Sequence, residues 1–167
     1  SDLLVKAKTL PPSEEGFVLR FENGLRLKVK GDEYKRIHAL ISRCTPLAMW
    51  EAMAAGDDLN AVRRDLPEEF WGDFDVITGV LDAQVAGKIE HIQAAAAAVD
   101  GLSDKEVGLR LGSFPEDVRR FIFPLRKFGS LLDGRTREAL FRSIRPTGNR
   151  LEGYTPSYAM NRITEER

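Results

Sequence analysis

Four residues near the start of the chain have side chains and a spacing that suit phosphate chemistry. Glu15 supplies a carboxylate beside the flexible Gly16, and Lys28 and Lys30 follow two residues apart. Side chains alternate between the two faces of a strand, so the two lysines point the same way if they lie on one. Paired cations suit phosphate oxygens, and a carboxylate suits a hard divalent cation. The spacing therefore predicts a combined phosphate and metal site.

These side chains need a β-hairpin over residues 15–30 to position them. Asn23-Gly24 joins two apolar runs and predicts a type I′ turn, in which both central residues have positive φ. The alternation adds Arg26 to the lysine face and directs the opposite set of residues toward a core: Leu25, Leu27 and Val29. Because two strands alone are marginally stable in water, we expect the hairpin to belong to a larger sheet.

The length of 167 residues predicts one domain, or one domain and part of a second, and the composition favours a soluble cytoplasmic protein. Apolar residues make up 43% of the chain, yet no apolar run is long enough to span a bilayer, so no membrane partner is expected. We also expect no signal peptide before the first charged residues. The single Cys44 excludes an internal disulfide and fits a reducing compartment, and we expect it to be a small core residue rather than a nucleophile.

Charge is distributed unevenly along the chain, although the net charge is only −1. Residues 51–75 contain eight acidic side chains and two arginines, whereas residues 119–150 contain nine basic side chains and two acidic ones. The basic region predicts a surface for a polyanion such as RNA, and four residues are the candidate contacts: Arg119, Arg120, Arg126 and Lys127. A solvated charged surface is the open alternative.

From residue 32 onward the pattern predicts helices, so the expected fold class is mainly α with a short N-terminal hairpin. The expected organisation is a hairpin unit over 1–31, a helical domain over 32–146 and an extended tail over 147–167. Pro124 should kink or split the helix that begins after Pro115, whose buried face should include Phe128. The two histidines, His38 and His91, are far apart in sequence, which disfavours a histidine metal site.

The hairpin also carries a family resemblance. Glu15-Gly16-Phe17-Val18, followed by Leu27-Lys28-Val29-Lys30 and then Tyr34, resembles the last two nucleotidyltransferase motifs of ATP-dependent RNA ligases. The closest likeness is to phage-type ligases that repair cut tRNA, in which a helical domain follows directly. The ending, at residues 128–134 and 143–146, is also similar, so the likeness covers roughly residues 10–146.

The resemblance implies a role for each matching residue. Glu15 would bind Mg²⁺ or Mn²⁺, directly or through water, and would belong with Gly16 to the ATP-binding site. Lys28 and Lys30 would be the catalytic cations that contact the nucleotide phosphates. The family joins RNA 3′-OH and 5′-phosphate ends through ligase–AMP and RNA–adenylate intermediates, and the helical domain would position structured RNA such as a tRNA-like fold.

The chain departs from the family at the covalent nucleophile, which is a lysine in an upstream K-x-x-G-type motif. Lys6-Ala7-Lys8-Thr9 is followed by prolines and not by glycine. We therefore expect a C-terminal ligase portion that needs a missing N-terminal ligase domain, is inactive alone and binds neither ATP nor the metal tightly by itself.

Two other readings stay open. The helices could form a protein- or nucleic-acid-interaction module with no catalytic role, and Ser103–Lys127 resembles a helix-turn-helix in pattern, although Pro124 interrupts its second helix. The hairpin could also be a β-hairpin without a binding site, whose lysines are simply solvated. No Ser/His/Asp, Cys/His or zinc pattern supports another class of enzyme.

Overall fold

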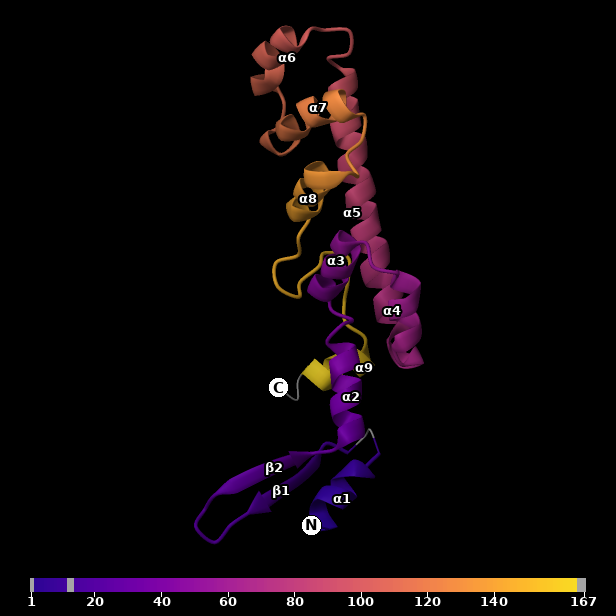
Figure 1. The fold of residues 1–167 in the computed structure, drawn as a ribbon, viewed down its shortest axis with the longest axis vertical. Helices are drawn as coiled ribbons and strands as arrows, with labels where there is room; N and C mark the ends of the chain where they lie inside the picture. Colours follow the sequence, from indigo (N-terminus) through magenta and orange to yellow (C-terminus); the bar gives the residue numbers. More distant parts are fainter. Residues whose placement is uncertain (1, 12–13, 165–167) are drawn as a thin grey trace.

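The computed structural model describes residues 2–11 and 14–164, and its mainly α fold with one N-terminal hairpin confirms the predicted fold class. In chain order the elements are α1 (Asp2–Lys8), β1 (Gly16–Arg20), β2 (Arg26–Lys30), α2 (Asp32–Ile41), α3 (Pro46–Ala55), α4 (Leu59–Asp65), η1 (Glu68–Phe70), α5 (Trp71–Ala97), α6 (Asp104–Arg110), η2 (Leu111–Ser113), α7 (Glu116–Phe128), α8 (Gly134–Ser143) and α9 (Tyr158–Thr164). The molecule is elongated, with the hairpin at one end and α6 at the other (Figure 1). No described helix is both long and apolar enough to cross a membrane.

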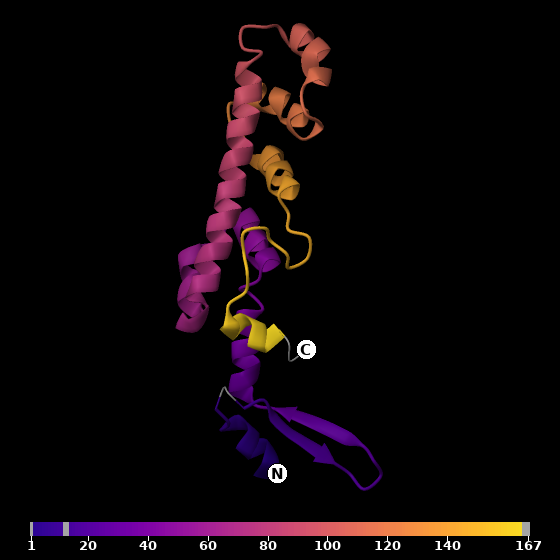
Figure 2. The same cartoon turned by 180° about the vertical axis from the view of Figure 1, so that it is seen from behind.

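Helix α5 runs along most of the helical part (Figures 1 and 2). Two apolar clusters include residues of this helix. The proximal cluster, nearer the hairpin, contains Ile41, Cys44, Met49, Met53, Leu66, Phe70, Phe74, Ile77, Leu81, Phe141, Leu151 and Met160. The distal cluster contains Ile92, Val99, Val107, Val118, Phe121, Ile122, Leu131 and Leu140. Val85 packs against both clusters. Gly72, Gly79 and Gly87 lie within α5 and do not interrupt its 27 residues.

Side chains close to the helix ends cap several of the helices. The Thr45 hydroxyl caps α3, and Asp58 accepts from the first amides of α4. Ser103 and Glu106 form a reciprocal capping box at the start of α6. Cys44 is fully buried in the proximal cluster, which confirms its predicted structural role.

The hairpin forms with the expected strands but with a different turn. Gly24 has a φ of 84°, whereas Asn23 has no positive φ, so the turn is not type I′. The Gly24 amide donates to Phe21 O at 2.9 Å, and the Phe21 amide donates to Leu25 O at 2.8 Å. The loop therefore has three residues, an arrangement that suits a tight turn followed by a left-handed glycine.

The apolar face of the hairpin is not buried in a core, contrary to the prediction. Leu25 and Leu27 are 58% and 50% exposed, and Val29 is only partly buried. Helix α1 contacts β2, but its own Leu4 and Val5 are exposed as well. Among the described residues the sheet consists of these two strands alone.

Two expectations for the helical part are also wrong. Helix α7 is not split at Pro124, although this residue lacks the amide hydrogen that would bond the Arg120 carbonyl, and Phe128 at the end of the helix is 63% exposed instead of buried. The expected extended tail folds back onto the molecule: Leu151 and Met160 join the proximal cluster, and Tyr158–Thr164 forms α9. Apolar side chains in this segment are buried against helices that are distant in sequence.

Candidate functional site

The hairpin register places the two lysines on one face. Gly16 pairs with Lys30 and Val18 pairs with Lys28, and residues paired across antiparallel strands share a face. Gly31 continues the ladder, because its amide donates to Glu15 O at 2.9 Å. The backbone of Glu15 is thereby fixed beside the end of β2, next to both lysines.

Gly16 is required by its backbone geometry. Its φ is 142°, a conformation that residues with side chains rarely adopt. A Cβ at this position would lie 2.0 Å from Val29 O and 2.9 Å from the Lys30 Cα. The close approach of the strands beside Glu15 therefore depends on glycine.

The side chains of Glu15, Lys28 and Lys30 converge. Glu15 Oε1 lies 2.5 Å from Lys28 Nζ and 3.3 Å from Lys30 Nζ. The hydrogen bond from Lys28, helped by Lys30, holds the pKa of Glu15 below its ordinary value, although partial desolvation opposes the shift. All three side chains remain open to solvent, with exposed fractions of 31% for Glu15, 49% for Lys28 and 46% for Lys30. The cluster is thus pre-assembled and its three side chains reach solvent, although the Glu15 Oε1 atom that meets both lysines is itself buried.

Helix α2 supports the lysine end of the cluster. Lys30 Nζ lies 5.4 Å from the ring centroid of Tyr34, in the range of a cation–π contact. Tyr34 is itself 7% exposed, and its ring centroid is 4.1 Å from that of His38. Sequence reasoning noted Tyr34 as part of the motif but did not find this stack, because it depends on the angle between β2 and α2.

The cluster offers one carboxylate, that of Glu15, to a metal ion that is shared with a ligand. No group of three or more His, Cys, Asp or Glu side chains able to hold a metal occurs among the described residues. Glu15 would therefore supply a single protein carboxylate, with phosphate oxygens and water completing the shell. Mg²⁺ is commonly bound in this way, whereas a cage built from protein alone needs more ligands.

The predicted RNA contacts lie at the other end of the molecule from the hairpin (Figure 1). Arg119 donates to Phe114 O, and Arg126 donates to Val99 O, Leu102 O and the Asp104 carboxylate. These two side chains therefore tie parts of the helical domain together. Arg120 and Lys127 are exposed on α7, each over the ring of the phenylalanine that follows it.

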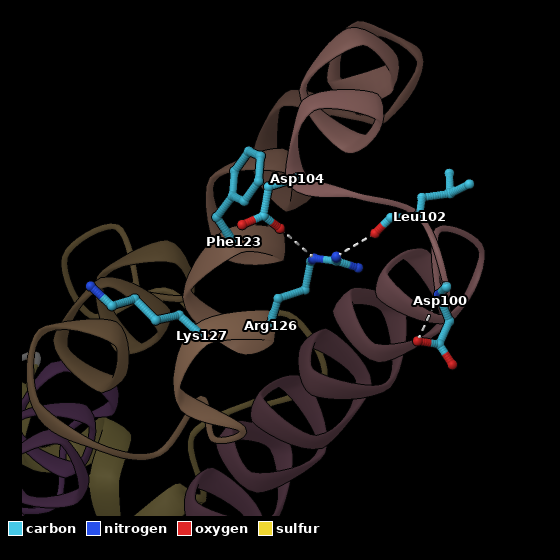
Figure 3. Close-up of a pocket in the computed structure, with 7 residues that line it drawn as sticks. Asp100, Leu102, Asp104, Phe123, Arg126 and Lys127 are labelled. Carbon is cyan, nitrogen blue, oxygen red and sulfur yellow. Dashed lines mark hydrogen bonds and ion pairs between the residues drawn. The ribbon is translucent and has the colours of Figure 1, made fainter.

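A surface cavity of about 560 Å³ lies beside α7, and Figure 3 shows its lining. Arg126 reaches between Asp104 and Leu102, while Lys127 extends away from Arg126. The lining mixes two carboxylates with two cations: Asp100, Gly101, Leu102, Asp104, Phe123, Arg126 and Lys127. This balance of charge does not make the cavity a phosphate site.

Sequence reasoning missed a buried polar cluster near the start of α5. Asp73 is 4% exposed, and its Oδ1 accepts from Tyr154 OH at 2.8 Å and from the Ser157 amide at 2.9 Å. Burial and the nearby Asp73 carboxylate raise the pKa of Tyr154 above its ordinary value. The partners are more than eighty residues apart, so no local pattern could reveal them.

No family model, curated protein or solved structure matches this chain. Function is therefore inferred from the hairpin geometry and from the order of its motifs.

Proposed function

We propose that this chain is the C-terminal portion of an ATP-dependent RNA ligase of the phage tRNA-repair type. Such an enzyme joins RNA 3′-OH and 5′-phosphate ends through ligase–AMP and RNA–adenylate intermediates. The observation that carries the proposal is the convergence of Glu15, Lys28 and Lys30 on one face of the hairpin. The reaction class is assigned from the resemblance of these motifs, and of the Tyr34 that follows them, to the ligase motifs.

The chemistry of the three side chains suits nucleotidyl transfer. Negative charge on phosphoryl oxygens is stabilised best by cations that are already in position, and the register holds Lys28 and Lys30 together. Glu15 would hold Mg²⁺ or Mn²⁺, which supplies further positive charge at the phosphates of ATP. In this role the Glu15 carboxylate exchanges its lysine partners for the metal, and the lysines exchange Glu15 for phosphate.

The nucleophilic lysine of the family would come from an N-terminal ligase domain that precedes the hairpin in the parent enzyme. We place this enzyme in the cytoplasm, where ATP and RNA are available. The exposed apolar face of the hairpin, including Leu25 and Leu27, supports the proposal because a larger sheet would cover it.

The helical domain would position structured RNA through the basic 119–150 region. Arg120 and Lys127 are the better candidates for phosphate contacts, since the guanidinium groups of Arg119 and Arg126 are engaged by carbonyls within the domain. RNA binding should weaken with rising salt, and it should weaken further in an Arg120→Ala, Lys127→Ala double variant.

The decisive experiment uses the complete reading frame that contains this sequence. The full protein is incubated with Mg²⁺ and ATP radiolabelled at the α-phosphate, and covalent labelling is measured after denaturation. Labelling should occur, and it should be lost in Lys28→Ala and Lys30→Ala. Lys105→Ala is the matched control, because Lys105 is an exposed lysine on α6. An unlabelled full protein, or full labelling of the Lys28→Ala variant, would reject the ligase assignment.

An interaction module is the second candidate, and exposed apolar side chains favour it. Leu109 and Phe128 are 81% and 63% exposed on α6 and α7. A protein partner recovered by pull-down, together with no RNA binding at low salt, would support this function over the ligase.

A further inference from the structure

The C-terminal segment 147–164 runs from the end of α8 back along the molecule to α2. Figures 1 and 2 both show this segment passing α3, and α9 lying beside α2. It therefore connects the helical body, defined here as α3–α8, with the hairpin arm, defined here as α1, the hairpin and α2.

The first attachment of this segment is polar. Asp73 lies in the first turn of α5, where the helix dipole favours a carboxylate. Its Oδ1 accepts hydrogen bonds from both Tyr154 and Ser157, and the side chain is almost fully buried. Hydrogen bonds to a buried charge are among the stronger ones in proteins. The Asp73 carboxylate thus fixes the chain just before α9 begins.

The second attachment is apolar. Met160 on α9 is 3% exposed and belongs to the proximal cluster together with Ile41 of α2 and Phe70 of η1. Helix α9 also contacts η1 directly. Earlier in the segment, Leu151 is buried in the same cluster. Met160 therefore belongs to a cluster that draws its side chains from both the arm and the body.

The covalent connection between arm and body is the short turn between α2 and α3. Residues 42–45 form this turn, with Cys44 buried and Thr45 capping α3. A few residues between two helices are sufficient to act as a hinge. Contacts on both sides of such a hinge decide how far it can rotate.

We infer that segment 147–164 is a brace that holds the hairpin arm at a fixed orientation to the helical body, through Asp73 and Met160. The inference stands whether or not the chain comes from a ligase. If it does, the brace sets the distance between the nucleotide phosphates at the hairpin and the RNA held by the body.

The test is a distance measurement between spin labels by pulsed electron resonance. One pair, Glu22→Cys and Ala86→Cys, reports the arm relative to the body, and a second pair, Ala86→Cys and Leu109→Cys, reports the body alone. All three sites are exposed, whereas Cys44 is buried and stays unlabelled. Met160→Ala removes the buried side chain that α9 contributes to the proximal cluster. Tyr158→Ala is the matched control on the same helix, because Tyr158 is 81% exposed.

The arm–body distances should be narrowly distributed in the unaltered chain and in Tyr158→Ala. In Met160→Ala the distribution should broaden about twofold while the body pair keeps its width, because only the hinge gains freedom. Tyr154→Phe, which removes one hydrogen bond to Asp73, should broaden it less.

Three results would overturn the inference. The arm–body distribution could already be broad in the unaltered chain, or it could be unchanged in Met160→Ala. Both pairs could also broaden together in Met160→Ala and in Tyr154→Phe, which would make the segment an ordinary part of the core and not a brace.

Discussion

Replacing Gly16 with alanine tests the geometry on which the candidate site depends. The new Cβ would lie 2.0 Å from Val29 O, well inside the 3.4 Å at which ordinary contact begins, and the obstacle is backbone that cannot rotate away. The positive φ adds a cost of about 1–3 kcal/mol. Loss of the hydrogen bond from the Gly31 amide to Glu15 O adds about 0.5–1.5 kcal/mol. Together the substitution should destabilise this end of the hairpin by about 2–4 kcal/mol.

Amide hydrogen exchange at Gly31 measures this effect locally. A destabilisation of about 1.4 kcal/mol raises the equilibrium constant for local opening tenfold. Exchange of the Gly31 amide should therefore accelerate by about 30- to 700-fold, or until protection is lost completely. Gly24→Ala is the matched control, since Gly24 also has positive φ but an added Cβ would meet no described atom within 4 Å. It should leave Gly31 nearly unchanged. Equal exchange in Gly16→Ala and the unaltered chain would refute the claim that glycine is required beside Glu15.

Three further predictions concern single side chains. Because its lysine partners hold the pKa of Glu15 below the ordinary 4.5, this pairing stabilises the hairpin above that pH, and the stabilisation is lost as the pH falls through the lowered pKa. The protection factor of the Gly31 amide, which is the intrinsic exchange rate at each pH divided by the observed rate, should therefore fall in acid, and Glu15→Gln should remove this pH dependence. Burial, assisted by the charges of Asp73 and Asp75, raises the pKa of Cys44 to about 12, so a thiol reagent at pH 8 should react with it only as denaturant unfolds the chain. Ser103→Ala removes the N-cap of α6 and should cost about 1 kcal/mol, measured as a lower denaturation midpoint by circular dichroism.

Local chemistry made much of the fold predictable. Asp58, Ser103 and Gly56 cap helices whose ends lie within a few residues of them, so their capping roles can be predicted from the local sequence. The strands of the hairpin are predictable for the same reason. The type of turn is not, because it depends on where Phe21 and Leu25 pair across the loop.

Contacts between distant segments were the part that could not be predicted. The sequence predicts Arg126 to be a surface cation, but its guanidinium group donates to three acceptors that lie 22 to 27 residues earlier in the chain. The tail looked polar and irregular, yet Asp73 fixes it through Tyr154, 81 residues away. Strand alternation predicted that Lys28 and Lys30 share a face, but it assigns Glu15 to the opposite face, so the contact between Glu15 and Lys28 was not predictable from alternation. The exposure of Leu27 depends on what covers the hairpin, which alternation does not specify either.

The arrangement of two apolar clusters along one helix affects how the molecule melts. Helices α5 and α8 contribute to both clusters, with Leu140 of α8 in the distal cluster and Phe141 in the proximal one, whereas each of the other contributing helices belongs to one cluster. Val85, in the middle of α5, packs against both. The two ends should therefore lose structure as separate cooperative units, with a half-folded species between them. Both tryptophans, Trp50 and Trp71, pack against the proximal cluster. Tryptophan fluorescence would consequently report the melting of one half and miss that of the other.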